Sequence, residues 1–325
     1  MRRLAEPFRP YEWAPSTEEL ALRAGLEPVQ ILRFDGNTPA RPLPSSRPGA
    51  VAEALAEVNT YQHGGHMELA AAIARYGGVE PKNVVLGAGA DDLIMLCARA
   101  FAGPGDQVAI PPEPTYPLFR VASVLTGASI GNDAPALTFA CRPGNPFGDL
   151  PDLPVSRPLA VDEAYFEYAG VSAAGLVHDE QVVVIRTFSK AFALAGARIG
   201  YLLAGRELAT ELRARQSPEP VSKLSAALAV AALRSPPDVG WVVEERERLA
   251  TELRTLGLEP LPSHANFVFV PVDDPQDLAD RLLAFGCVPR VLDGGIRISV
   301  RDREDDDFLL RALTHALDGE PSDSL

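Results

Sequence analysis

The chain has 325 residues, of which 46% are hydrophobic and 23% charged, as is typical of a globular protein long enough for two domains. Its formal net charge of −14 argues against a nucleic-acid partner, which would need a basic face, and no apolar run approaches the ~20 residues of a membrane span. The start has no apolar segment behind its arginines and the three cysteines lie far apart, so we expect a cytoplasmic protein with reduced thiols and no secretory signal.

Residues 1–48 are rich in Pro and Arg and predict an arm with one short helix at 17–24. From about Ala50, helical periodicity alternates with short β-branched runs, and this alternation predicts α/β units around a largely parallel sheet. The expected helices are 68–76, 91–100 and 116–125, and the expected strands are 84–86, 107–110, 137–141, 159–161, 182–185 and 199–203.

After Arg206 the pattern changes to long helices, at 207–215, 221–233 and 239–256. Two prolines at 236 and 237 end one helix and start the next, so we place a domain boundary there. This divides the chain into an arm (1–48), a large domain (49–235) and a small α+β domain (236–325). The small domain is expected to have strands at 266–270, 288–291 and 296–300 and helices at 276–285 and 304–317.

Lysine is rare in this chain. Of its 30 Lys and Arg residues, only Lys82, Lys190 and Lys223 are lysines. Arginine stays protonated at any working pH, whereas a lysine among apolar side chains such as Phe188 and Phe192 can lose its proton and form an imine. The alternative is that a GC-rich genome favours arginine and that Lys190 is an ordinary surface residue. The neighbouring motifs decide between these interpretations.

Three further clusters could surround a cofactor. Residues 87–92 (Gly-Ala-Gly-Ala-Asp-Asp) stand between a predicted strand and helix, where free N–H groups can bind a phosphate, although a capped helix start is the alternative. Asp162 directly follows a buried strand, with Tyr165 three residues later. Ser189 and Arg198 supply a hydroxyl and a planar guanidinium near the lysine. An anion cradle, a carboxylate, a tyrosine, an amine and an arginine in this order are what pyridoxal 5'-phosphate requires.

The chain resembles the fold-type I, class I/II aminotransferases, and most of all their histidinol-phosphate aminotransferase branch. The resemblance runs from about Tyr11 to Arg311 and is most specific at Ser189-Lys190 with Arg198, and at Asp162-Glu163-Ala164-Tyr165. It implies an α/β fold with a mainly parallel sheet flanked by helices in the large domain and a smaller α+β domain at the carboxyl end. The arm is expected to pack on the small domain.

The resemblance also implies roles around the cofactor. Lys190 would bind pyridoxal phosphate as an imine and then shuttle a proton between the substrate Cα and C4′ of the cofactor. Asp162 would pair with the pyridine nitrogen, Asn145 and Tyr165 would hydrogen-bond the phenolic oxygen, and Tyr116 would stack on the ring. The phosphate ligands would be the backbone of Ala90 and Asp91 together with Ser189 and Arg198.

Other implied roles concern the substrate and a second subunit. Tyr61 matches a tyrosine that reaches the phosphate of the neighbouring subunit, which implies a homodimer with shared active sites. Arg297 would take the substrate α-carboxylate or its surroundings, and Arg290 would be a second substrate-binding arginine. Tyr11 resembles an arm tyrosine near the substrate phosphate, and Asn37 belongs to a reduced version of the family's Asn-Glu-Asn-Pro motif.

Some positions depart from the family pattern. Gly144 stands where asparagine is usual, Phe147 replaces threonine, and Arg301-Asp302 stand where Gly-Thr is common. These departures leave the cofactor set intact and put substrate identity in doubt. His63 and His66 lack partners at metal-ligand spacing, so we expect no metal site.

Three functions are therefore considered. The first is an aminotransferase that moves an amino group to a 2-oxo acid such as 2-oxoglutarate, with histidinol phosphate as the favoured donor and aromatic amino acids next. The alternative is an enzyme with the same cofactor but another reaction, a threonine-phosphate-decarboxylase-like lyase of cobalamin synthesis. A non-catalytic, cofactor-binding DNA regulator is disfavoured by the short arm and the acidic chain.

Overall fold

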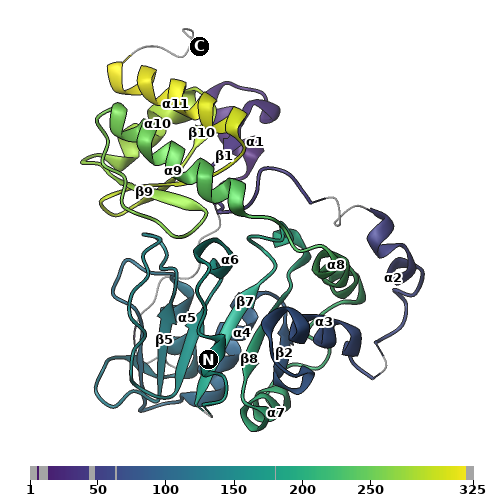
Figure 1. The fold of residues 1–325 in the computed structure, drawn as a ribbon. Helices are drawn as coiled ribbons and strands as arrows, with labels where there is room; N and C mark the ends of the chain where they lie inside the picture. The colour runs from purple at the N-terminus through teal and green to yellow at the C-terminus, as the bar shows by residue number, and fades with distance from the viewer. Residues whose placement is uncertain (1–5, 7–13, 44–47, 63, 180, 320–325) are drawn as a thin grey trace. The chain divides into compact units, whose positions relative to one another are not determined.

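The computed structural model describes residues 6, 14–43, 48–62, 64–179 and 181–319 (Figure 1). The chain divides into two compact units. The large unit contains Met1–Tyr11, Arg41–Pro143 and Pro151–Pro237, and the small unit contains Glu12–Ala40, Gly144–Leu150 and Asp238–Leu325. The small unit thus includes Gly144–Leu150, a segment that the predicted boundaries assign to the large domain. His264 N donates to Gly148 O at 2.7 Å, which ties that segment to the small unit.

The large unit is built on a seven-stranded sheet with the order β2-β8-β7-β6-β5-β3-β4. β8 runs antiparallel to both β2 and β7, and the other neighbours pair in parallel. Every residue of β5 to β8 is buried, as expected for a sheet covered on both faces. The strands are β2 (Val84–Gly87), β3 (Gln107–Ala109), β4 (Ser129–Ile130), β5 (Leu137–Cys141), β6 (Leu159–Asp162), β7 (Val182–Thr187) and β8 (Gly200–Ala204).

Helices pack on this sheet and on one another. Leu93 and Ile94 of α4 and Phe119 of α5 belong to one buried apolar cluster with Phe139 and Leu202 of the sheet. α8 lies beside α2 and α3 (Figure 1). The helices are α2 (Ala52–Ala56), α3 (Met67–Gly77), α4 (Ala90–Phe101), α5 (Leu118–Thr126), α6 (Phe166–Ala169), α7 (Arg206–Ala214) and α8 (Lys223–Arg234), with 3-10 turns η3 (Pro48–Val51), η4 (Pro81–Asn83), η5 (Ala174–Leu176) and η6 (Ala195–Ala197).

The small unit combines an antiparallel sheet of order β11-β12-β9 with a parallel pair, β1-β10. The pairing of β1 with β10 attaches the amino-terminal segment to the carboxyl-terminal one. Its elements are α1 (Thr17–Ala24), η1 (Pro28–Gln30), β1 (Leu32–Arg33), α9 (Gly240–Thr255), β9 (Phe267–Pro271), α10 (Pro275–Ala284), β10 (Cys287–Val288), β11 (Arg290–Leu292), β12 (Gly295–Ser299) and α11 (Arg303–Asp318).

The prediction of one strand at 288–291 is wrong. β10 ends at Val288 and pairs with β1, whereas β11 begins at Arg290 and pairs with β12. Pro289 stands between the two strands and has no N–H to donate to a ladder. The proline therefore separates the strand into two parts that belong to different sheets.

Among the described residues, no helix combines the length and the apolar character that crossing a membrane would require.

Candidate functional site

Two neighbouring strands of the large unit bring the predicted amine and carboxylate to one edge of the sheet. β6 ends at Asp162, and β7 ends at Thr187, three residues before Lys190. The two strands pair in parallel, so their carboxyl ends lie at the same edge, where open α/β sheets bind ligands. Lys190 Nζ lies 5.6 Å from the centroid of the Tyr165 ring. The amine, the carboxylate and the phenol predicted from sequence are thus close together.

A tight turn presents Lys190. Ala193 N donates to Lys190 O at 3.0 Å, and Leu194 N donates to Phe188 O at 2.9 Å. Phe188 and Phe192 are buried, and their ring centroids lie 4.9 Å apart. Apolar packing therefore fixes the base of the turn, and Lys190 itself is half-buried.

Asp162 is a buried carboxylate at the end of β6. Its side chain accepts a hydrogen bond from Ala164 N at 3.0 Å. Burial is the main reason that the pKa of Asp162 is raised to about 7, while the nearby Lys190 charge lowers it. A carboxylate in this setting is stabilised by a cationic hydrogen-bond donor, such as a protonated pyridine nitrogen.

The residues of the predicted anion-binding site, called the cradle below, lie at the start of α4. Gly89 caps this helix with φ of 87°, and the first helical residues, Ala90 and Asp91, have backbone N–H groups that point out of the helix end. Arg198 Nη2 lies 2.9 Å from Asp91 Oδ2, so the guanidinium stands beside the helix end. A Cβ at residue 89 would lie 2.8 Å from Arg198 Nη2. Glycine is favoured here because of the positive φ, and an added Cβ would also displace the Arg198 guanidinium.

Tyr116 and Ser189 complete the group in the large unit. Tyr116 Oη donates to Asp91 Oδ1 at 2.8 Å, which holds the phenol beside the cradle. Ser189 is buried and accepts a hydrogen bond from Thr187 Oγ1 at 2.9 Å. Three adjacent segments thus offer partners for three groups of the cofactor. The cradle suits the phosphate, the Lys190 amine suits the aldehyde, and the buried Asp162 carboxylate suits the pyridine nitrogen. These residues fit pyridoxal phosphate.

The cradle depends on a glycine in β8. A Cβ at residue 200 would lie 2.7 Å from Arg186 O, 2.9 Å from Gly89 C and 3.0 Å from Ala90 N. We predict that Gly200→Ala lowers the free energy of unfolding by about 1–3 kcal/mol and weakens cofactor binding, because these backbone atoms must move. Urea unfolding and titration of the cofactor-free protein with pyridoxal phosphate measure the two effects.

Gly196→Ala is the matched control for this change, because a Cβ there would have no atom within 4 Å. Equal cofactor affinity in the two variants would contradict the dependence of the cradle on Gly200.

One feature escaped the sequence prediction: a buried ion pair behind the site. Arg186 Nε donates to Glu163 Oε2 at 3.0 Å, and the two side chains are 3% and 2% exposed. Ser172 Oγ also donates to Glu163 Oε2, at 2.9 Å, and the guanidinium of Arg186 lies 3.6 Å from the centroid of the Phe166 ring. These contacts fix the segment between Asp162 and Phe166. An arginine inside the apolar run of β7 was the sequence signal for a buried partner.

A second group of predicted residues lies in the small unit. Arg297 of β12 donates from Nη1 to Asn145 Oδ1 at 2.7 Å and from Nη2 to Asp35 O at 2.8 Å. These two hydrogen bonds fix the Asn145 side chain to the small sheet. Arg290 stands opposite Arg297 in the β11–β12 pair, so both side chains leave the same face of the sheet.

The other predicted residues have different surroundings. Asn37 is 1% exposed, and its Oδ1 accepts a hydrogen bond from Ser299 Oγ at 3.0 Å. Its side chain is therefore buried in the small unit. Tyr61 is 77% exposed. Tyr11 lies outside the described residues. The roles of these residues in binding stay predictions.

The departures from the family pattern have local explanations. A Cβ at Gly144 would lie 2.2 Å from Asp149 Oδ1, so a larger residue here would require the exposed Asp149 side chain to move. The Phe147 ring packs edge-on against Phe269 with centroids 5.0 Å apart. Arg301 donates to Arg33 O at 3.0 Å, which ties it to the amino-terminal segment. In the part of the chain that the structure describes, no group of three or more His, Cys, Asp or Glu residues could hold a metal ion; His63 is outside that part.

Comparison with known proteins extends these observations. A family model described as aminotransferase class I and II matches residues 34–132 and 125–313. A histidinol-phosphate aminotransferase from Caldanaerobacter subterraneus subsp. tengcongensis is 32% identical over 80% of this chain and 85% of its own length. Another from Roseiflexus castenholzii is 34% identical over 94% of this chain and 95% of its own length.

A solved structure is similar to almost the whole chain. The histidinol-phosphate aminotransferase from Sinorhizobium meliloti, in complex with pyridoxal-5'-phosphate, has a TM-score of 0.80 and 27% identity. The match covers 94% of this chain and 96% of that one. It confirms the predicted α/β fold class.

Proposed function

Because the chain belongs to the class I and II aminotransferases, we propose that it transfers the amino group of histidinol phosphate to a 2-oxo acid such as 2-oxoglutarate. Its cofactor is pyridoxal 5'-phosphate. The observation that carries the proposal is the meeting of Lys190, Asp162 and the α4 cradle at one edge of the sheet. When bound, the cofactor withdraws electrons from the substrate Cα, so that a proton can leave that atom.

The chain's own residues bind and orient these groups. Lys190 Nζ would hold the cofactor at its aldehyde carbon and would also serve as the base that takes the proton from the substrate Cα. Asp162 keeps the pyridine nitrogen protonated, because a buried carboxylate favours a cationic partner. Arg198, Ser189 and the N–H groups of α4 neutralise the phosphate.

The donor is proposed from two observations. Arg290 and Arg297 stand opposite each other in a strand pair, so one face of the small sheet carries two guanidinium groups suited to anionic substrates. The relatives described above are called histidinol-phosphate aminotransferases. Aromatic amino acids are the next candidates as donors. The decarboxylase alternative receives no support from these names.

A homodimer with shared sites belongs to the same proposal. Tyr61 is exposed, as are Leu55, Val58 and Met67 around it in the chain, and exposed apolar side chains in one segment are typical of an interface. We also propose a cytoplasmic location, in which the free thiols of the three cysteines would stay reduced.

A half-reaction screen tests the proposal. Holoenzyme is mixed in turn with histidinol phosphate, an aromatic amino acid and threonine phosphate, without any 2-oxo acid. We expect histidinol phosphate to bleach the near-visible absorbance of the Lys190-bound cofactor fastest, with no CO₂ release. Release of CO₂ from threonine phosphate would replace the aminotransferase proposal by the decarboxylase.

Arg290 is expected to recognise the donor phosphate. We predict that Arg290→Ala raises the KM for histidinol phosphate by about 10- to 100-fold, because a charge-assisted hydrogen bond contributes about 1.5–3 kcal/mol. The KM for an aromatic amino acid should change by less than about twofold, since that donor has no phosphate to lose a contact. Steady-state kinetics with both donors measure the difference.

Arg281→Ala serves as the control, because Arg281 is an exposed arginine of α10 paired with Asp277 at 2.6 Å. An equal loss with both donors, or no loss with either, would exclude the phosphate role of Arg290.

A further inference from the structure

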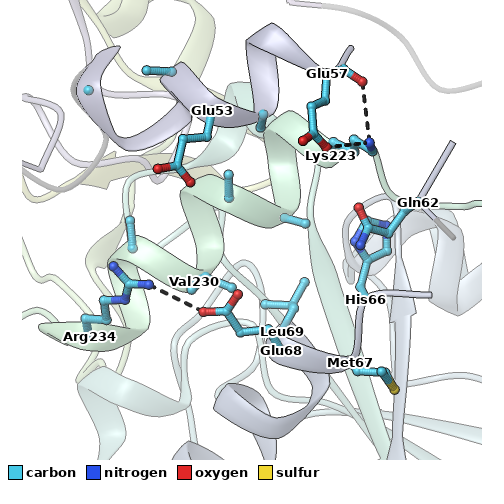
Figure 2. Close-up of a pocket in the computed structure, with 16 residues that line it drawn as sticks. Glu53, Glu57, Gln62, His66, Met67, Glu68, Leu69, Lys223, Val230 and Arg234 are labelled. Atoms are coloured by element: carbon cyan, nitrogen blue, oxygen red, sulfur yellow. Dashed lines mark hydrogen bonds and ion pairs between the residues drawn. The ribbon is translucent and has the colours of Figure 1, made fainter. Parts of the chain in front are cut away.

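Lys223 makes an unusual set of contacts at the start of α8 (Figure 2). Its Nζ donates to Thr60 Oγ1 at 2.7 Å, to Glu57 Oε2 at 3.2 Å and to Glu57 O at 3.4 Å. An ammonium has three N–H donors, and three acceptors from one short segment receive them. The lysine side chain is 13% exposed, although its partner Glu57 is 72% exposed.

The segment that Lys223 holds is also fixed at its far end. Thr60 Oγ1 and Thr60 N both donate to Glu57 O, at 3.0 and 3.1 Å, which closes residues 57–60 into a turn. Beyond this turn, His66 Nε2 donates to Val221 O at 2.9 Å. Both anchors therefore lie on residues 221–223. Tyr61 follows the first anchor directly and projects to solvent.

Apolar packing contributes little to holding this segment. α2, the helix before it, has no buried residue. A cavity of about 580 Å³ is lined by residues of α2, α3 and α8, and Glu57, Gln62, His66 and Lys223 line part of it (Figure 2). Where a segment buries no apolar side chain, a few polar contacts determine its position. The position of Tyr61 thus depends on the Lys223 contacts.

We propose that Lys223 is a positioning residue that presents Tyr61 to the cofactor phosphate of the neighbouring subunit. This inference rests on the proposed function, which gives Tyr61 that contact. Lysine suits the position because its three donors leave one atom in different directions, whereas the N–H groups of arginine lie in a plane. The ammonium can therefore bind one carboxylate, one carbonyl and one hydroxyl at once.

A second contact of α8 lies close to the cofactor site of the lysine's own subunit. Ser225 Oγ donates to Ala197 O at 2.7 Å, next to the phosphate-binding Arg198. A loss of Lys223 that merely loosened α8 would therefore weaken cofactor binding in the same subunit. The proposal predicts weakening in the other subunit, and this difference separates positioning from general stability.

Single and double variants give the first test. Pyridoxal phosphate is titrated into cofactor-free Tyr61→Phe, Lys223→Met and the double variant, and its dissociation constant is measured from the absorbance. We expect about tenfold weaker binding for Tyr61→Phe, which loses one hydrogen bond to the phosphate, and a similar change for Lys223→Met. The double variant should bind the cofactor no more weakly than Tyr61→Phe alone, because both changes remove the same contact between Tyr61 and the phosphate.

Lys82→Met is the matched control, since Lys82 is an exposed lysine paired with Glu80 outside the site, and its affinity should be unchanged. If Lys223→Met does not fold, Lys223→Arg replaces it, because it keeps the charge and loses the three-way geometry.

Hybrid dimers, purified with two affinity tags, give the second test. In a dimer of Lys190→Ala with Lys223→Met, the one site that can bind cofactor covalently receives Tyr61 from a subunit with intact Lys223, so binding should match wild type. In a dimer of the double variant Lys190→Ala/Lys223→Met with wild type, that site receives Tyr61 from the altered subunit. Its affinity should fall about tenfold.

The outcomes separate the two ideas. Wild-type affinity in Tyr61→Phe would overturn the Tyr61 contact of the proposed function, and this inference with it. Weak binding in Tyr61→Phe but not in Lys223→Met, additive effects in the double variant, or the opposite order of the hybrids would overturn the role of Lys223 alone.

Discussion

Replacing Lys190 by alanine is expected to lower transamination by at least about 10⁴-fold, because it removes both the covalent attachment and the proton carrier. The turn that presents Lys190 is closed by backbone hydrogen bonds and by buried Phe188 and Phe192. The variant should therefore keep the fold and still bind pyridoxal phosphate through the cradle, but without the near-visible absorbance of the imine. Single-turnover kinetics with histidinol phosphate and an absorbance spectrum measure the two effects.

The control for this variant is Lys82→Ala, which removes the exposed lysine of the same chain and should change neither property. A Lys190→Ala protein that kept the absorbance band would refute the cofactor assignment. A protein that lost the band but kept the activity would refute the role of Lys190 as proton carrier.

Asp162→Asn is expected to lower kcat by about 10²- to 10³-fold and, in the cofactor-free protein, to raise stability at alkaline pH. The first effect follows because an amide cannot hold the pyridine nitrogen in its protonated form. The second follows from burial, which raises the pKa of Asp162 to about 7 in the folded protein, against 3.9 or so when unfolded.

Between those two pKa values the folded state holds a proton that the unfolded state has lost. The contribution of Asp162 to the free energy of unfolding therefore falls as pH rises from about 4 to about 7, and stays low above it. Asparagine cannot ionise, so the variant avoids this loss. Its advantage over wild type should grow between pH 5 and pH 8.5, to roughly 4 kcal/mol at most.

Urea unfolding of both cofactor-free proteins at these two pH values measures the difference. Burial also raises the pKa of Glu167 and of Asp306 to about 8, but both groups are present in the two proteins and cancel in the comparison. An advantage that is the same at the two pH values would show that Asp162 is ionised in the folded protein throughout this range.

Elements with strong local signals could be predicted from the sequence. α1 begins and ends at the predicted residues, because Ser16 Oγ accepts from Glu19 N and Gly25 closes the helix with φ of 70°. The strands β6 and β7 follow their apolar runs closely. α2 was not predicted, because it has no buried residue and hence no apolar periodicity.

The same division applies to the site. Lys190 and Asp162 were found by short motifs beside buried strands, which are local features. The pairing of Arg198 with Asp91 joins residues 107 positions apart, and the pairing of Glu163 with Arg186 depends on strand order. Neither can be read from spacing. Asn37 was named by the family motif, and its Oδ1 accepts from Ser299 Oγ; its role in substrate binding stays a prediction.

The loop that carries Asn145 has a consequence for how this part of the sequence can diverge during evolution. Gly144 N donates to Asp149 O and Gly148 N donates to Gly144 O, at 2.9 and 2.8 Å, so the loop holds its own shape, while Arg297 fixes the Asn145 side chain. Phe147, in the same loop, packs its ring against Phe269 of β9. An exchange at this one position leaves in place the hydrogen bonds that shape the loop and hold the Asn145 amide, so position 147 is free to vary between relatives while the loop keeps its form.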